Sequence, residues 1–583
     1  MKYLLLLLSS TLSLSVLARP SSTQPRDLPT CRLIPGDASW PSAADWASLN
    51  QQVEGRLIAS TPLGAVCHNT FVSSALGKVN TYDAAKCSDL RNTWFLPETH
   101  YVHPSSPMQY TSTNNSCNPF DSDPSAPCSI GNHAVYAINA TAPAHVQAGI
   151  AFARQHNIRL VIRNTGHDYL GRSTGPHSLA IWTHNLKSTE LISSWGGPGD
   201  YKGPAMKLGA GVMGIDAYRA AHTEGLVVVG GNCPTVGLSG GYTQGGGLGP
   251  LTSVHGLAAD QVLEWTVVTA DGALVTANAN SNPDLFWALR GGGGGTFGVV
   301  TSMTVKAFPD SRTSSAFVNV VDTGSNTDAI YKGFETFIST QLAALVDQGV
   351  YVLWVLNPAG FFIQARFALG MKQSELDALM QPTVRSLQSL NLAADYVSME
   401  NPDFLTAFET TPGAQWNVSD NNTGGRLAPR SLVTDPAKVG ALVSAIRSVG
   451  QQTLITGVAF NATRGGVSSP DEVAAHPRFR DSLFNIFLGL PTRYDDWQAN
   501  LDAMDTITNK FLADLEAVTP GAGAYLNEAD VQQPDWQTEF YGSHWDRLSK
   551  VKAQYDPEGL FYARTAVGSE QWTEQADGRL CKL

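Results

Sequence analysis

Glycine-containing clusters dominate the middle of this chain, and each lies beside an apolar, strand-like run. The four clusters are 163–168 (Arg-Asn-Thr-Gly-His-Asp), Gly230–Gly241, Gly245–Gly249 and Gly291–Gly298. Glycine adopts positive φ and lets backbone approach a ligand closely, so such clusters often form cradles for anions or cofactors. A single cluster would be an ordinary loop, but four beside neighbouring strands favour one shared ligand.

The runs beside these clusters alternate between strand and helix patterns from Ala134 onward. Predicted strands are 134–138, 160–163, 179–182, 206–208, 226–229, 262–269, 273–277 and 299–307. Predicted helices are 143–156, 215–224 and 282–289, the first with a proline in its first turn. The dipeptide Asp271-Gly272 predicts a hairpin.

A change in composition near Pro309 predicts a second domain, from about residue 311 to 530. Glycine becomes sparser there, and longer helical patterns such as 328–347 and 437–449 alternate with strands such as 350–356. Residues 31–130 are rich in Pro, Ser and Asn, show little periodicity and contain no repeats.

The first 18 residues resemble a secretory signal peptide. Lys2 precedes an apolar run that extends to Leu17, and the small residues Val16 and Ala18 predict cleavage after Ala18. The run is shorter than the ~20 residues of a membrane span. Export is consistent with the five Asn-x-Ser/Thr sequons, at Asn114, Asn139, Asn417, Asn421 and Asn461.

The cysteine count is odd, which matters in an exported protein because its thiols are expected to pair. There are seven, so at least one stays unpaired. Cys117 and Cys128 flank a polar loop that a disulfide would close, but six cysteines allow about fifteen pairings and the sequence leaves them open. Cys233 lies apart, in the glycine-rich middle, and is predicted to be reactive, intermolecular or bonded to something else.

Charge and metal-ligand patterns exclude two classes of function. The formal net charge is −12 and 15% of residues are charged, which is unlike a nucleic-acid binder. No H-E-x-x-H or C-x-x-C pattern is present, so no metal site is predicted.

Three short motifs resemble known fingerprints but fail in context. Gly209–Gly214 fits G-x-G-x-x-G, yet no acidic residue ends the next strand, and Gly293–Gly298 is followed by a strand pattern instead of a helix. Ser239 lies in a G-x-S-x-G sequence, but glycines follow it where a hydrolase needs a helix. A serine hydrolase stays an alternative of low weight.

Ordered motifs over about 400 residues resemble the vanillyl-alcohol oxidase superfamily of flavoproteins with a PCMH-type FAD-binding domain, in particular its berberine-bridge-enzyme-like branch. The motif at 163–174 resembles the loop whose histidine bonds the flavin 8α-methyl, and 231–237 resembles the loop whose cysteine bonds flavin C6. Motifs at 240–247, 256–262 and 286–299 follow in the family's order, and the resemblance resumes at 540–567. Within the branch, the sequence more closely resembles secreted fungal members, among them isoamyl-alcohol-oxidase-like proteins.

The resemblance implies an α+β fold: a two-lobed PCMH-type FAD-binding domain with an inserted substrate domain, an antiparallel sheet backed by helices. The flavin domain would comprise 19–310, with its core at 134–310, and 531–583; the substrate domain would be 311–530. The implied covalent ligands of FAD are His167 and Cys233. The other implied cofactor-binding residues are Arg163, Asn164, Thr165, Gly166, Asp168, Ser173, Thr235, Gly237, Gly240, Gly241, Tyr242, Gly245, Gly246, Val300 and Tyr541.

The implied activity is that of a secreted, monomeric oxidase acting on a small molecule. It would transfer hydride from a C–H bond of an alcohol, carbohydrate or secondary metabolite to flavin N5, and O2 would be reduced to H2O2. No membrane or nucleic-acid partner is expected. The alternatives are an oxidative cyclase or dehydrogenase, and a flavin-free binding protein that kept the fold. No motif identifies the catalytic base, which branch members take from Tyr, Glu or Asp.

Overall fold

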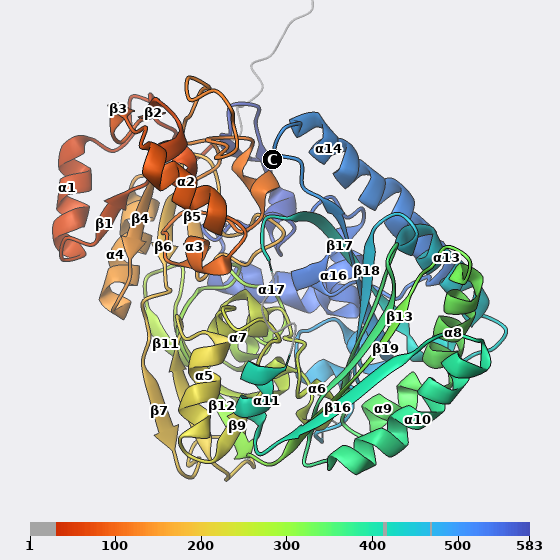
Figure 1. The fold of residues 1–583 in the computed structure, drawn as a ribbon. Helices are drawn as coiled ribbons and strands as arrows, with labels where there is room; N and C mark the ends of the chain where they lie inside the picture. Colours follow the sequence, from red (N-terminus) through yellow and green to blue (C-terminus); the bar gives the residue numbers. More distant parts are fainter. Residues whose placement is uncertain (1–30, 412–416, 467–468) are drawn as a thin grey trace, which may run out of the picture.

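Three β-sheets of four, six and seven strands organise the protein (Figure 1). The structure is a computed structural model that describes residues 31–411, 417–466 and 469–583. The predicted signal peptide, residues 1–18, lies outside the described residues.

The four-stranded sheet forms the first lobe, in the order β1-β4-β6-β5. Its strands are β1 (Leu57–Ala59), β4 (Tyr136–Asn139), β5 (Leu160–Arg163) and β6 (Leu179–Trp182). β4 and β5 run parallel to β6, and α4 (Pro143–Gln155) is the crossover helix that this parallel connection requires. Buried Val146 and Ile150 of α4 pack into the core of this lobe. The strands predicted at 160–163 and 179–182 are confirmed to the residue.

The six-stranded sheet forms the second lobe. Its strands are β7 (Thr189–Ile192), β8 (Ala205–Gly209), β9 (Leu226–Val228), β10 (Val262–Val268), β11 (Leu274–Ala277) and β12 (Val299–Pro309). β10 and β11 are antiparallel and joined at Gly272, which has a φ of 87°, so the predicted hairpin is confirmed. Helices α5 (Gly214–His222) and α7 (Pro283–Ala288) also match their predicted positions.

The third sheet has seven antiparallel strands, in the order β16-β13-β15-β14-β18-β19-β17. Its strands are β13 (Thr313–Val321), β14 (Tyr351–Asn357), β15 (Gly360–Leu369), β16 (Asp395–Asn401), β17 (Asn421–Pro429), β18 (Leu454–Ala459) and β19 (Ser482–Pro491). On β14, Val352 and Trp354 belong to the core shared with the helices, whereas Tyr351 and Leu353 belong to the core shared with the second lobe. The predicted α+β arrangement, two lobes with an added antiparallel sheet backed by helices, is confirmed.

Helices cover the outer face of the seven-stranded sheet, at the right of Figure 1. They include α8 (Thr327–Thr340), α9 (Leu342–Asp347), α10 (Gln373–Ser389), α13 (Val439–Gly450) and α15 (Ala513–Val518). The single helix predicted at 328–347 is wrong, because the chain breaks at Gln341 into α8 and α9. The break lets Leu345 and Val346 turn into the core.

The weakly patterned N-terminal region, 31–130, folds into short elements held by disulfides. They are α1 (Ala43–Gln52), β2 (Thr70–Ser73), β3 (Gly77–Asn80), α2 (Ala84–Thr93) and α3 (Pro97–Tyr101). Cys67–Cys87 joins the segment before β2 to α2, and Cys117–Cys128 closes the predicted loop. Such cross-links constrain the unfolded chain where few apolar contacts are available.

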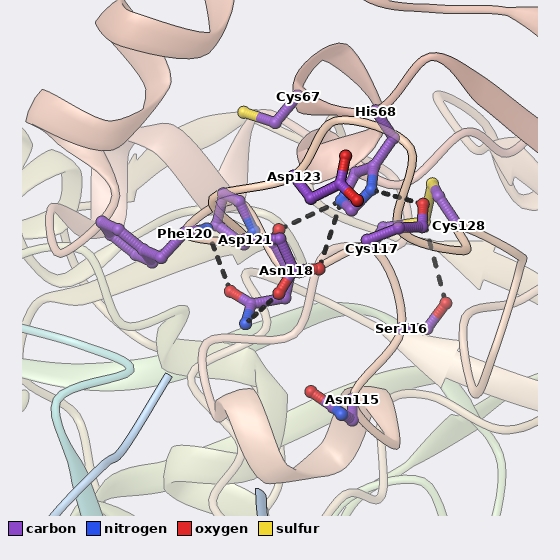
Figure 2. Close-up of polar contacts among 12 residues, drawn as sticks. Cys67, His68, Asn115, Ser116, Cys117, Asn118, Phe120, Asp121, Asp123 and Cys128 are labelled. Carbon is purple, nitrogen blue, oxygen red and sulfur yellow. Dashed lines mark hydrogen bonds and ion pairs between the residues drawn. A yellow bond between two sulfur atoms is a disulfide. The ribbon is translucent and has the colours of Figure 1, made fainter. Parts of the chain in front are cut away.

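His68 ties the two ends of that loop together (Figure 2). Its Nδ1 lies 3.0 Å from the carbonyl oxygen of Ala126, and its Nε2 lies 3.0 Å from that of Asn118. Asp121 Oδ2 lies 4.0 Å from the same Nε2. The side chain is fully buried, so its ring N–H replaces water as the donor to one of these two backbone carbonyls.

Both ends of the described chain meet at the first lobe. Cys31 and Cys581 form the third disulfide and an antiparallel bridge, and Arg579 pairs with Asp37 at 2.6 Å. The C-terminal elements are α16 (Trp536–Tyr541), α17 (Trp545–Tyr555), β20 (Trp572–Glu574) and β21 (Leu580–Lys582). Phe561 also bridges in parallel to Leu160 of β5.

None of the helices in the described ranges is both long enough and apolar enough to cross a bilayer.

Buried histidines make stability depend on pH. Burial lowers the pKa of His100 to about 4 and that of His133 to about 4, against about 6.5 when unfolded. Their stabilising contribution is complete above pH 6.5 and is lost as the pH falls towards 4. We expect a loss of about 2 kcal/mol per histidine between pH 7 and pH 5, measured by thermal or urea unfolding.

The variant H133N tests this explanation, because asparagine can still donate to the Ile130 carbonyl that His133 Nδ1 contacts at 2.9 Å. In H133N the free energy of unfolding should fall less steeply as the pH decreases from 7 to 5. An unchanged pH dependence would contradict the explanation.

Candidate active site

A cavity lies between the glycine clusters of the flavin-binding lobes and the inner face of the seven-stranded sheet. Its floor includes His167, Cys233 and the backbone of Gly240 and Gly241. Its opposite wall is formed by residues from three strands and from the turn η8 (Leu526–Glu528). The wall residues are Tyr351, Leu353, Thr456, Val458, Phe487, Tyr525 and Glu528.

His167 and Cys233 lie side by side on the cavity floor. Cys233 Sγ is 4.0 Å from His167 Nε2, although the two residues come from different glycine clusters. Thr235 Oγ1 lies 2.7 Å from the same Nε2 and 3.6 Å from the sulfur. Thr235 therefore engages Nε2 and leaves His167 Nδ1 as the nitrogen without a hydrogen-bond partner among the described residues.

Burial sets the charge of both groups. It lowers the pKa of His167 to about 3, helped by the neighbouring His100 and Arg163. It raises the pKa of the Cys233 thiol, against hydrogen bonds from Thr235 that lower it. At neutral pH the pair is therefore a neutral imidazole with an available lone pair and a protonated thiol. Cys233 is the free cysteine, as predicted, and the other six are paired.

Asn164 fixes the distance between two clusters. Its Nδ2 donates to the Ala210 carbonyl at 2.6 Å and to Thr183 Oγ1 at 3.0 Å. A Cβ on Gly237 would lie 1.9 Å from Asn164 Oδ1, whereas a Cβ on Gly241 would meet no atom within 4 Å. Glycine at 237 is therefore needed for close approach, and Gly241 faces open space in the cavity.

Most residues predicted to bind the cofactor line this cavity. They are Asn164, Thr165, Gly166, His167, Asp168, Ser173, Cys233, Gly237, Gly240, Gly241, Tyr242 and Val300. The carboxylate of Asp168 accepts hydrogen bonds from the backbone nitrogens of Leu170 and Ser173, so it shapes its own loop.

Five predicted residues do not line the cavity. Arg163 lies beneath the floor, where it donates to the carbonyls of His100 and His103, and Thr235 acts through the hydrogen bonds described above. Gly245 packs against Asn527, and Gly246 packs near Ala475. The hydroxyl of Tyr541 donates to the carbonyl of Thr565 at 3.0 Å.

Polar side chains that the sequence reasoning missed also face the cavity. Several of their buried atoms lack a hydrogen-bond partner in the part of the chain that is described. They are Arg172 Nε and Nη1, Asn232 Oδ1, Ser239 Oγ and Gln244 Oε1, together with the predicted residues' Asn164 Oδ1 and Tyr242 OH. Because buried polar groups are rarely unpaired, these atoms fit a cofactor with many polar groups and a flat ring system, as FAD has.

Ser239 does not fit a hydrolase nucleophile. It lies fully buried in the turn η3 (Leu238–Tyr242), and no described histidine contacts its hydroxyl. No strand leads directly into it, as the nucleophile elbow requires.

Comparisons with known proteins agree with this geometry. Residues 135–278 match the FAD binding domain family, and residues 524–568 match the berberine and berberine-like family. FAD-linked oxidoreductase sor8 of Hypocrea jecorina (strain QM6a) is 41% identical over 558 residues, 95% of this chain and 93% of that protein. The sequence resemblance was predicted to resume at Phe540, but the second match already begins at 524, before Glu528.

Solved structures agree as well. The VAO-type flavoprotein MtVAO615 from Myceliophthora thermophila C1 is 38% identical with a TM-score of 0.88, covering 95% of this chain and 100% of that one. Glucooligosaccharide oxidase from Acremonium strictum, described as carrying a 6-S-cysteinyl, 8α-N1-histidyl FAD, is 19% identical with a TM-score of 0.63, covering 74% of this chain and 91% of that one.

A cavity with these donors inside this fold defines a flavin-dependent oxidoreductase, and FAD is its cofactor. The chain belongs to the berberine-bridge-enzyme-like branch of the VAO-type FAD-linked oxidoreductases.

Substitution of Gly237 tests the close approach to Asn164. G237A should displace the Asn164 amide and destabilise the protein by about 1–3 kcal/mol, because the amide can move only by giving up its hydrogen bonds to Ala210 and Thr183. G241A is the matched control, since its Cβ meets no protein atom. Thermal unfolding of both apoproteins is the measurement, and equal stability of the two would contradict the packing argument.

Proposed function

We propose that the protein is a secreted oxidase whose FAD is bonded to both His167 and Cys233. The observation that carries the proposal is their juxtaposition on the cavity floor, with Cys233 Sγ 4.0 Å from His167 Nε2. Two groups this close can reach neighbouring positions on one edge of a ring system. The flavin described for glucooligosaccharide oxidase, linked to one histidine and one cysteine, supports the same chemistry.

The charge state of His167 supports bond formation through Nδ1. Its low pKa keeps the imidazole neutral, and in the tautomer whose Nε2–H donates to Thr235 Oγ1 the lone pair on Nδ1 is available. The glycine clusters would hold the polar tail of FAD because their backbone lines the cavity, and Arg172 would join them because its Nε and Nη1 have no hydrogen-bond partner among the described residues.

When bound, FAD supplies the acceptor for a hydride from substrate, and O2 reoxidises it with formation of H2O2. The chain's own residues determine which substrate fits. Tyr169 and Phe487 both line the cavity, and their rings contact each other with centroids 5.6 Å apart. Leu353 and Val458 extend this apolar wall. Such a wall favours an alcohol with an apolar, aryl or alkyl body over a carbohydrate, whose hydroxyls need polar partners.

We also propose the domain boundaries implied by the resemblance, with the flavin domain at 19–310 and 531–583 and the substrate domain at 311–530. Export is supported by the three disulfides, which persist in oxidising compartments. Exposure of Asn114 supports glycosylation of that sequon. We propose finally that the enzyme is a monomer and that its substrate is a small molecule.

Removal of each linking residue tests the two flavin bonds. C233A should keep yellow colour after acid precipitation through His167 but with a changed flavin spectrum, and H167A should keep it through Cys233. The double variant should release its flavin. Intact-protein mass spectrometry and absorbance measure the result, with C233S as a near-isosteric control. An unchanged C233A spectrum would refute the second bond, and a colourless wild type would refute the proposed function.

Peroxide release tests the substrate class. Benzyl alcohol, cinnamyl alcohol and 1-octanol should each yield H2O2 in a peroxidase-coupled assay, whereas glucose and cello-oligosaccharides should not. Turnover with an artificial electron acceptor but without peroxide would instead indicate a dehydrogenase. Preference for the oligosaccharides would contradict the role given to the apolar wall.

A further inference from the structure

We propose that Glu528 is the catalytic base, taking the hydroxyl proton of an apolar primary alcohol as hydride leaves the same carbon for the flavin. This inference rests on the proposed function and names the residue that completes it. No sequence motif identifies the base, and Glu528 lies outside every motif that carries the resemblance.

The position of Glu528 is set from two sides. Its neighbour Asn527 donates through Nδ2 to the carbonyls of Gly241 at 3.0 Å and Tyr242 at 3.1 Å, so η8 is anchored to the glycine cluster of the cavity floor. From the other side, a Cβ on Gly425 of β17 would lie 2.3 Å from the Glu528 carbonyl oxygen, so the strand backbone approaches η8 closely. Glu528 is therefore fixed where the flavin lobes meet the substrate sheet.

The carboxyl group has one hydrogen bond and no cation. Asn485 Nδ2 of β19 donates to Oε2 at 2.7 Å, and no described residue donates to Oε1. None of the ion pairs among the described residues involves Glu528. The side chain lines the cavity, so Oε1 is the oxygen available to a substrate hydroxyl.

The groups that face Glu528 are tyrosines from four separate segments. They are Tyr169 after β5, Tyr242 in η3, Tyr351 in β14 and Tyr525 before η8, and each lies close enough for the Glu528 charge to raise its pKa. Burial raises the pKa of Glu528 itself to about 7, against the hydrogen bond from Asn485 that lowers it. A general base works best when its pKa lies near the working pH, so both the position of Glu528 and its pKa suit the role of a base.

The proposed step balances. The alcohol O–H bond breaks and its proton passes to Glu528 Oε1, while the C–H bond breaks and hydride passes to the flavin. A C=O double bond forms, so the alcohol is oxidised by two electrons to an aldehyde and the flavin is reduced by two. Glu528 then returns the proton to solvent.

The variant E528Q tests the role, because glutamine keeps the shape and cannot accept the proton. We expect anaerobic reduction of the flavin by benzyl alcohol, cinnamyl alcohol or 1-octanol to slow by about 10²–10⁴-fold. The wild-type rate should rise with pH to a plateau above about pH 7, and E528Q should lose that dependence. Flavin content and covalent attachment should not change. D535N, the same carboxyl-to-amide change at an exposed site of the same segment, is the matched control.

Two further readouts separate a base from a structural residue. N485L removes the hydrogen bond that favours the carboxylate, so the pH midpoint should move upward while Glu528 stays in place. Infrared spectra of the holoenzyme at different pH values need no substrate, and they should contain a carboxyl band titrating near pH 7 that E528Q removes.

A wild-type rate and midpoint in E528Q would overturn the proposal, and so would failure of all three alcohols to reduce the wild-type flavin. Lack of a covalent bond or of peroxide would count against the proposed function alone, because anaerobic reduction needs neither.

Discussion

Contact between Asn164 and the glycine backbone opposite it sets the geometry on which the cavity depends. One side-chain amide, bonded to Ala210 and Thr183, joins loops that leave strands of both flavin-binding sheets. Gly237 lets this amide approach, since a Cβ there would overlap it. The distance between the two loops decides where His167 and Cys233 lie, so their juxtaposition follows from the contact of Asn164, three residues before His167, with Gly237, four residues after Cys233.

The second half of the site is the seven-stranded sheet, one face of which packs against helices while the other faces the cavity. Val352 and Trp354 of β14 bury themselves against helices, while the alternate residues Tyr351 and Leu353 face the cavity. Because both faces are apolar, the strand reads as a continuous hydrophobic run, and its sequence does not tell which face meets a substrate. Helices hold one face fixed, and the other is free to vary in shape and chemistry.

Local patterns predicted much of the flavin-binding core and little of the N-terminal region. The strands at 160–163 and 179–182 were found because short apolar runs between glycine-rich loops are a local signal. β1 was not found, because its three half-buried residues gain stability only by pairing with β4. The helix break at Gln341 was missed for a related reason: the apolar period continues through it, and packing of α9 beneath β14 imposes the turn.

The sequence by itself determined the glycine loops and the odd cysteine, because backbone freedom and the number of thiols are properties of the chain. It also indicated the family through motifs in fixed order. Only the tertiary structure decided which cysteines pair, which polar atoms lack partners and what surrounds Glu528. The physical reason is desolvation: the pKa of that carboxyl rises because residues far apart in the chain exclude water from it, and no local pattern encodes their meeting.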